Sequence, residues 1–222
     1  IAQGADVSIP DIVILNNYTD FRDIILADEG CSTVHLKRNH HSTCGQTWDM
    51  HRSAKNYVSV VNIKGDDTHP GALLFSLVGC IGMMGYSTNK LMVGVNNLNT
   101  MNANANIIWP VLIRHMLEKS KNFTEMRTHL RNAKVTSGHN YLISSENESE
   151  HWEVLPTIQE NVSSITSDQS NGHIFHTNHC LGEKTVLKEE QLTVNTTTLN
   201  RYRLLEKNLP SCKNFEDRKS TR

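Results

Sequence analysis

A cysteine that follows a glycine is the residue of this sequence best suited to covalent chemistry. Cys31 lies in the stretch Asp-Glu-Gly-Cys-Ser-Thr at residues 28–33. Gly30 supplies the backbone freedom that brings the Cys31 thiol onto the carbonyl group before it. An N→S acyl shift and hydrolysis at that bond would leave Cys31 as a new N-terminus. Its α-amino group, with a pKa near ~8, would then serve as the base for its own thiol. The sequence therefore predicts a self-processing cysteine nucleophile, and the alternative is a buried structural cysteine.

A carboxylate follows in the motif Gly-Gln-Thr-Trp-Asp, which ends at Asp49, 18 residues after Cys31 (49 minus 31). Residues 31–37 alternate as a strand does, and residues 45–50 are predicted to be its antiparallel partner. If these strands pair, Asp49 and Cys31 lie side by side at one end of the sheet. A carboxylate there would favour the protonated amine and tune its pKa. The alternative is an aspartate in a turn.

Several short motifs together resemble the acyl-coenzyme A:6-aminopenicillanic acid acyltransferase family of N-terminal-nucleophile (Ntn) hydrolases, in order and in spacing. That family is related to β-alanyl-amine hydrolases and bile-salt hydrolases. The motifs fall within residues 10–205 and lie at 29–33, 45–49, 82–87, 94–98, 110–114, 176–179 and 201–203.

The resemblance implies an α+β fold, the four-layer αββα sandwich of Ntn hydrolases, incomplete here at both ends. It places the cleavage point between Gly30 and Cys31. Residues 1–30 are then the end of a propeptide or α-subunit segment, and residues 31–222 form a C-terminally short catalytic β-subunit. The cleaved N-terminal segment is the expected second subunit. Bile-salt hydrolases carry an arginine where this chain has Gln46, so recognition of an anionic group there is not supported.

The same resemblance points to two asparagines and an arginine. Asn178 lies in the motif His-Thr-Asn-His at 176–179, Asn96 in the motif at 94–98, and Arg201 in the motif at 201–203. A side-chain amide aimed at a developing oxyanion contributes about 3 kcal/mol to catalysis, so both asparagines are candidate oxyanion donors. Arg201 matches a late active-site arginine of the relatives. The alternatives are two turn asparagines and a solvated helix arginine.

Three histidines, His173, His176 and His179, recur at intervals of three and invite a metal-site interpretation. On a strand, however, a spacing of three places neighbouring residues on opposite faces. Such side chains do not converge on one ion. A metal-dependent hydrolase is therefore kept only as an alternative hypothesis.

Composition excludes some other classes of function. The 222 residues carry a net charge of −1, with a sequence pI of about 6.9 and a mean hydropathy of −0.44. No basic patch of the kind that binds phosphate backbones is present, so we expect no nucleic-acid partner. The longest apolar stretch, residues 72–84, is shorter than the ~18 residues of a membrane span, so we expect no membrane partner.

The cysteines favour a lone nucleophile with buried thiols over a disulfide framework or a structural zinc site. They number five, which is odd, and none forms a Cys-x-x-Cys pair. They are Cys31, Cys44, Cys80, Cys180 and Cys212.

The pattern along the chain runs from strands to helices and back to strands. A capped helix begins at Ser8, with Pro10 in its first turn. A turn-like link at 38–42 joins the first two strands. Further strands are predicted at 57–63, 72–78, 91–95, 141–144, 150–154 and 173–176, and helices at 108–118 and 122–132.

Three classes of function follow. The first is an Ntn amidase or acyltransferase that acts on a small linear amide or thioester through an acyl-enzyme on Cys31, with no cofactor and no metal. The second is an unprocessed, catalytically silent homologue that acts as a binding protein. The third is the metal-dependent hydrolase. The joint presence of Cys31, Asp49 and Asn178 favours the first.

Overall fold

The computed structural model describes residues 1–17, 30–101, 103–190 and 197–212. Their strands form two antiparallel sheets, one of three strands in the order β10-β1-β2 and one of seven in the order β3 to β9. The smaller sheet consists of β1 (Cys31–Arg38), β2 (His41–Trp48) and β10 (Gly172–His176). The larger consists of β3 (Val58–Ile63), β4 (Ala72–Leu77), β5 (Met84–Ser87), β6 (Met92–Asn97), β7 (His139–Ser144), β8 (Ser149–Leu155) and β9 (Ile158–Ile165).

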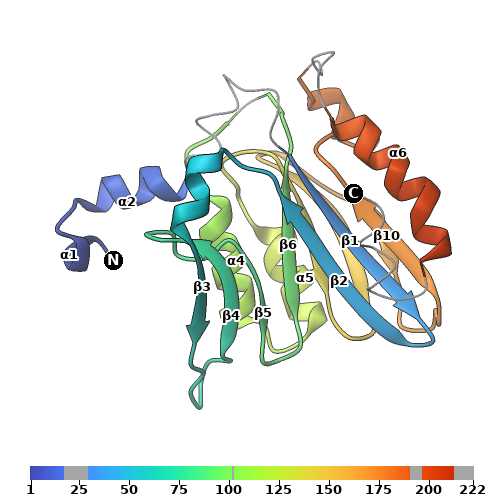
Figure 1. Ribbon diagram of the computed structural model, residues 1–222, viewed down its shortest axis with the longest axis horizontal. Coiled ribbons are helices and arrows are strands. Elements are labelled where there is room, and N and C mark those ends of the chain that lie inside the picture. The colour runs from blue at the N-terminus through green and yellow to red at the C-terminus, as the bar shows by residue number, and fades with distance from the viewer. Residues whose placement is uncertain (18–29, 102, 191–196, 213–222) are drawn as a thin grey trace.

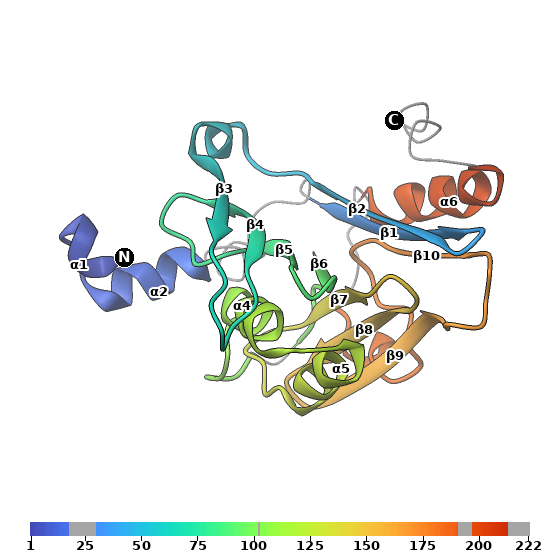
Figure 2. The same cartoon turned by 90° about the horizontal axis from the view of Figure 1, so that it is seen from below.

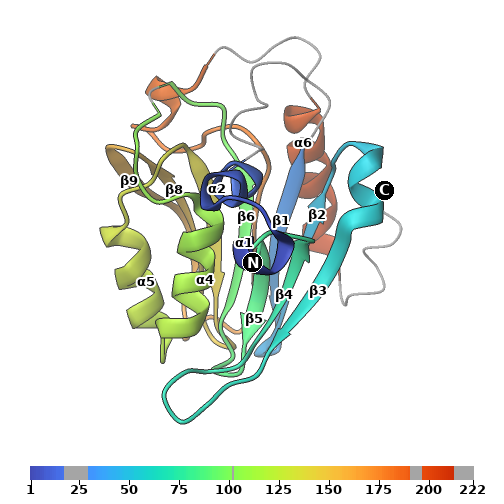
Figure 3. The ribbon, with the colours of Figure 1, turned by 90° about the vertical axis from the view of Figure 1, so that its left-hand side faces the viewer.

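Helices cover the outer face of each sheet, which makes four layers. Helices α4 (Trp109–Lys119) and α5 (Phe123–Asn132) pack on the large sheet, and α6 (Thr198–Asn208) packs on the small one (Figures 1 and 2). The view in Figure 3 shows the same order from the side, with α4 and α5 on one flank and α6 on the other. The expected αββα sandwich is therefore confirmed.

Most predicted elements are present, and the differences have local causes. β5 and β9 were not predicted, because β5 is only four residues long and β9 is rich in polar residues. The link between β1 and β2 is tighter than expected. Asn39 and His40 both have positive φ, 48° and 64°, as a type I′ hairpin turn requires, so β2 begins at His41.

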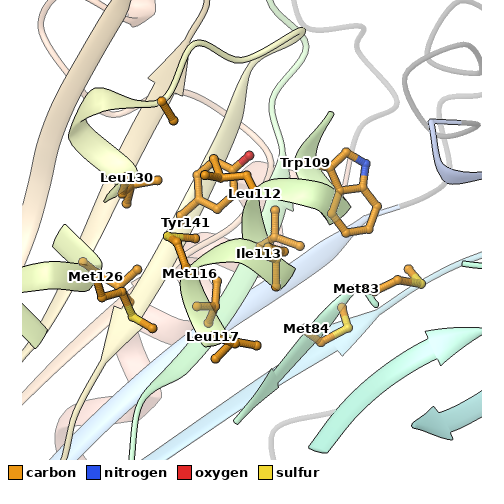
Figure 4. Close-up of a cluster of buried hydrophobic side chains, with 14 of the residues drawn as sticks. Met83, Met84, Trp109, Leu112, Ile113, Met116, Leu117, Met126, Leu130 and Tyr141 are labelled. Atoms are coloured by element: carbon orange, nitrogen blue, oxygen red, sulfur yellow. The ribbon is translucent and has the colours of Figure 1, made fainter. Parts of the chain in front are cut away.

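The layer between the large sheet and its helices is a continuous apolar core. Strand residues alternate between faces, so Tyr141 and Ile143 of β7 point outward to α4 and α5. Helix α4 presents Leu112, Ile113 and Met116 to them, all nearly inaccessible to solvent (Figure 4). This layer carries the ordinary hydrophobic stabilisation of the domain.

The layer between the two sheets is polar by contrast. Buried polar side chains from both sheets fill much of it. They include Thr33, His35 and Lys37 of β1, Asn96 of β6, Asn140 and Ser144 of β7, His151 and Glu153 of β8, and His176 of β10. The Lys37 ammonium group, for example, donates to the carbonyl oxygens of Asn147 and Thr166 at 2.7 and 3.2 Å.

The helix expected near Ser8 is α2 (Ile9–Asn16), which follows the short α1 (Ala2–Ala5). Ser8 and Asp11 form a capping box, and Pro10 lies in the first turn. The C-terminal end of α2 is anchored to the loop after β4, because the Asn16 side chain bonds Gly79 O and Ile81 N. No helix within the described ranges is both long and apolar enough to cross a membrane.

The remaining helical turns are the 3₁₀ segments η1 (Arg52–Tyr57), η2 (Val186–Lys188) and η3 (Leu209–Ser211). Tyr57, predicted as the start of a strand, ends η1 instead, and β3 begins at Val58.

Candidate active site

Cys31 is the first residue of β1, the central strand of the small sheet. Its backbone is fixed by pairing with Trp48 of β2, and its side chain is buried, with 5% of its surface exposed. The candidate site therefore lies at a strand end, between the two sheets, with a nucleophile whose position is set by the sheet.

Asn178, in the loop after β10, contacts Cys31 at two points. Its Nδ2 group donates to the Cys31 sulfur at 3.1 Å, and its Oδ1 atom accepts from the Cys31 N–H at 2.8 Å. Nδ2 also donates to the carbonyl of Asn97 at 3.0 Å. The backbone N–H of Asn178 donates to the Thr198 hydroxyl at 2.8 Å, which ties this loop to α6.

Arg201 reaches the same point from α6. Its Nη1 group donates to the carbonyl of Cys31 at 2.6 Å and to the Ser32 hydroxyl at 2.9 Å. Its Nη2 group donates to Asn178 Oδ1 at 2.8 Å. Burial lowers the pKa of Arg201, and the nearby Cys31 and Asp49 groups act in the opposite direction. Arg201 therefore lies in the site and is not a solvated helix arginine.

Asn96 approaches from the facing sheet and is fully buried. Its Oδ1 atom accepts from the Thr33 hydroxyl at 2.6 Å and from Asn140 Nδ2 at 2.8 Å. Its Nδ2 group finds no conventional hydrogen-bond partner among the described residues, although it lies near enough to Cys31 to influence the thiol. A buried N–H group without an acceptor beside a nucleophile can donate a hydrogen bond to an oxygen atom of the substrate.

Asp49 stands at the same end of the sheet, directly after β2. Its backbone N–H donates to the carbonyl of Gly30 at 2.7 Å, across the expected cleavage point. Its side chain is exposed and interacts electrostatically with Arg201. The Cys31 N–H bonds Asn178 and not Asp49, so a link between this carboxylate and the freed amine stays a prediction.

Gly30 is required here for close approach. Only Gly79 and Gly82 have positive φ among the described glycines, so Gly30 adopts no conformation reserved for glycine. A Cβ atom at this position would instead collide with the Arg201 guanidinium and press on Asn178 Oδ1. The structure thus gives a spatial reason for the glycine where the sequence suggested backbone freedom.

The electrostatics of the site keep the thiol protonated until a base acts. Burial raises the pKa of Cys31, and four neighbours oppose the rise: Asn178, the backbone of Asn97, Asn96 and Arg201. Burial dominates. The site therefore stabilises negative charge beside the sulfur while it disfavours a free thiolate in the resting state.

The three histidines proposed as an alternative metal site have separate partners. His176 is fully buried and bonds Glu153 at 2.8 Å, whereas His179 bonds the hydroxyls of Thr177 and Thr198. His173 lies partly exposed, next to Phe175. Within the part of the chain that the structure describes, no group of three or more His, Cys, Asp or Glu residues could hold a metal ion.

Some members of the site were missed from the sequence. Asn97 acts through its backbone, so its side-chain identity gives no signal. Ser32 and Thr33 entered the prediction only as parts of a strand, and Asn140 lay outside every predicted element. Thr33 could have been found from strand alternation, because it shares a face of β1 with Cys31.

Gln46, where the resemblance to bile-salt hydrolases led us to look for an arginine, joins the two sheets. Its side-chain amide accepts from Val95 N at 2.9 Å and donates to Val95 O at 2.7 Å. β5 pairs with β6 only as far as Val93, so the amide bonds backbone groups that this neighbouring strand does not reach. Gly94 leaves room for it, since a Cβ there would lie 2.9 Å from Gln46 Oε1.

An open groove of about 2080 Å³ passes the site. Strand β2 and helix α6 line one side, and strands β3 to β5 line the other. Ser32, Asp49 and Arg201 face it, and they connect it to the buried Cys31.

Comparisons with known proteins show which proteins this chain resembles in sequence and in fold. The chain is 25% identical over 187 residues to the 40 kDa form of acyl-coenzyme A:6-aminopenicillanic-acid-acyltransferase from Emericella nidulans. That alignment covers 82% of this chain and 50% of the relative, so the chain spans about half of that relative's length. In fold it resembles the Caenorhabditis elegans orthologue of N-acylethanolamine-hydrolyzing acid amidase, with a TM-score of 0.56. The structural match covers 86% of this chain and 83% of that one, at 14% identity.

A family model also matches, over residues 36–220, which begins just after Cys31 and takes in Asp49, Asn96, Asn178 and Arg201. Because this match covers well over half of the 222 residues, the chain belongs to the acyl-coenzyme A:6-aminopenicillanic acid acyl-transferase family.

Proposed function

We propose that this chain is the catalytic part of a self-processing cysteine amidohydrolase or acyltransferase of the Ntn type. Cys31 carries the acyl group of a small linear amide or thioester, and water or an amine then receives it. Family membership supports the reaction class, and the residues gathered around Cys31 support the nucleophile. The proposal needs no metal and no cofactor.

The observation that carries the proposal is the double contact of Asn178. One amide bonds both the sulfur of Cys31, at 3.1 Å, and its backbone nitrogen, at 2.8 Å. These are the two atoms that an N-terminal cysteine nucleophile uses, as attacking atom and as base. A buried structural cysteine needs neither contact.

The groups around the bond between Gly30 and Cys31 support the proposed self-processing. The Cys31 sulfur attacks the Gly30 carbonyl carbon and forms a thioester, and the C–N bond breaks with its electron pair on the Cys31 nitrogen. That nitrogen takes the proton that the thiol has lost. Water then hydrolyses the thioester and frees both the thiol and the Gly30 carboxyl group. The Asp49 N–H, at 2.7 Å from the Gly30 oxygen, supports charge on that oxygen.

Turnover uses the freed amine as base. The α-amino group takes the thiol proton, and the sulfur attacks the acyl carbon of the substrate. Asn178 Nδ2 and the open Nδ2 group of Asn96 stabilise the oxyanion. Arg201 holds the Cys31 carbonyl and the Asn178 amide in place. The leaving amine carries the proton away, and water or a second amine releases the acyl group.

The same proposal assigns residues 1–30 to the N-terminal subunit and residues 31–222 to the catalytic one. Helix α2 belongs to the first part and Gly79 and Ile81 to the second. The hydrogen bonds of Asn16 to that loop therefore join the two pieces after cleavage.

The test is the intact mass of the purified protein. We expect two pieces that meet between Gly30 and Cys31, and a single chain for Cys31→Ala. Cys212→Ala is the matched control, because it removes another buried thiol at the far end of α6 and should be cleaved normally. A cut elsewhere, or equal cleavage of Cys31→Ala, would refute the proposal. An uncut wild-type chain with an unreactive Cys31 would favour the binding-protein alternative.

A further inference from the structure

The orientation of the Asn96 amide decides whether it presents N–H groups or an oxygen atom to Cys31. A carboxamide can be turned about its last bond, and the two orientations occupy nearly the same space. Only the orientation with Nδ2 toward Cys31 can stabilise negative charge there. Something in the structure must therefore select it.

Two donors from the polar layer make that selection. The Thr33 hydroxyl, at 2.6 Å, and the Asn140 Nδ2 group, at 2.8 Å, both bond Asn96 Oδ1. If the Asn96 amide were reversed, its own N–H groups would face Asn140 Nδ2, and two donors would oppose each other in a buried place. A buried donor without an acceptor is destabilising, so the reversed orientation is disfavoured.

Asn140 in turn contacts the ring of His151. His151 Nδ1 lies 3.0 Å from Asn140 Nδ2 and 3.2 Å from Asn140 Oδ1. Burial lowers the pKa of His151 well below its ordinary value of 6.5, and His176 and His35 lower it further, so the ring is neutral and Nδ1 can accept. In the tautomer with the hydrogen on Nε2, His151 Nδ1 accepts from the Asn140 amino group, which donates to Asn96 Oδ1 as well.

Alternation along the strands places Thr33 where it can act on the site. Thr33 is two residues from Cys31 on β1, so the two side chains lie on the same face of the small sheet. Asn96, which contacts Thr33 from the facing sheet, is thereby held next to Cys31.

We propose that Thr33 and Asn140 are positioning residues that lock the Asn96 side chain with its N–H groups toward Cys31, and so set up an oxyanion donor for the acyl-transfer step. The inference rests on the function proposed above and deepens it. Neither residue touches the substrate, and both act through Asn96. Asn96 Nδ2 has no hydrogen-bond partner among the described residues. It can therefore bind the substrate oxygen without first breaking another hydrogen bond.

The test pairs Thr33→Val, which keeps the shape and removes the hydroxyl, with Thr33→Ser, which keeps the hydroxyl. The first readout does not need activity. In NMR spectra of the full chain, the side-chain amide signals of Asn96, assigned by their loss in Asn96→Asp, should move in Thr33→Val and stay in Thr33→Ser. Asn140→Leu provides a second removal of a donor, should Thr33→Val fail to fold.

The second readout is turnover of a small N-acyl anilide. We expect kcat to fall about 10-fold to 10²-fold in Thr33→Val and Asn140→Leu, with KM nearly unchanged, because an oxyanion donor acts in the transition state. Thr33→Ser should keep kcat within about twofold.

The outcomes separate this inference from the proposed function. If the Asn96 signals do not move in either donor-removing variant, the positioning role is wrong, whether or not Cys31 is catalytic. If they move while kcat stays at the wild-type level, Asn96 is not an oxyanion donor. If the wild type shows no turnover that Cys31→Ala abolishes, the proposed function fails, and the NMR result still decides the orientation.

Discussion

The two faces of the large sheet are held by different kinds of interaction, although the same strands form both. On its outer face, Tyr141 and Ile143 pack with α4 in an apolar layer. On its inner face, Asn140 and Ser144 of the same strand join a polar layer that reaches Cys31. Non-directional burial suffices for the outer face. The inner face depends on directional bonds, in which each group fixes its neighbour. The first holds the domain together, and the second orients the site.

The largest expected effect comes from breaking the contact between Glu153 and His176 in the inner layer. Glu153 and His176 are fully buried and bond at 2.8 Å, and Glu153 also accepts from the backbone of Leu181 at 2.6 Å. Glu153→Gln removes the charge and should lower the free energy of unfolding by about 3–5 kcal/mol. Denaturant unfolding of both proteins measures the difference. A loss below about 1 kcal/mol would show that the pair is not important for stability.

The pH dependence sharpens this first prediction. Burial raises the pKa of Glu153, but the hydrogen bond and charge of His176, together with Thr185 and Leu181, outweigh it, so the pKa lies below its ordinary value of 4.5. A depressed carboxyl pKa stabilises the fold above the unfolded-state value, and this contribution is lost as the pH falls through the folded-state value. The gap between wild type and Glu153→Gln should therefore shrink below about pH 4.5.

The next effect concerns chemistry at the edge of the polar layer. Asn178→Ala should lower kcat by about 10²–10³, because it removes the donor at the Cys31 sulfur. Circular dichroism should show an intact fold, since the loop keeps its backbone bond to Thr198. Nearly full turnover of the N-acyl anilide by this variant would make Asn178 a structural turn residue.

The outer layer should behave in the opposite way. Ile143→Val deletes one methylene group from the apolar core and should lower the free energy of unfolding by about 0.5–1.5 kcal/mol. Because Ile143 points away from Cys31, kcat and KM should stay at wild-type values when measured well below the melting temperature. A clear change in kcat would mean that the two layers are coupled and would weaken the comparison.

The smallest effect is expected at Asp49. Its exposed carboxylate favours the protonated α-amine, so Asp49→Asn should slow self-processing and lower the pKa on the acidic limb of kcat/KM. We expect a few tenths of a pKa unit, since solvent screens an exposed charge, and a smaller shift at high salt. An unchanged profile would leave only the backbone contact to Gly30 as the role of this residue.

Hydrophobic periodicity predicted most of the strands and helices, and the family resemblance predicted their four layers. The expected pairing of residues 31–37 with residues 45–50 also placed Cys31 and Asp49 at one sheet end. The sequence could not predict the partners of Asn96 or Gly30, because these depend on side chains that meet across layers from distant parts of the chain. The arginine that requires the small residue at position 30 lies 171 residues further along (201 minus 30). Polar β9 escaped prediction because its pairing, not its pattern, makes it a strand.

The Gln46 amide has a consequence for how specificity can change in this architecture. The amide bonds both the N–H and the carbonyl group of Val95. It therefore takes the place of one residue of β5, which does not pair with β6 beyond Val93. Its oxygen atom and one of its hydrogens are thereby committed to assembly. An arginine at this position could bind an anionic ligand. It has no acceptor atom, however, so the hydrogen bond from Val95 N would be lost. The preference for ligand charge and the joining of the two sheets therefore depend on the same side chain. A substitution that changes the charge preference would need another residue to bond Val95.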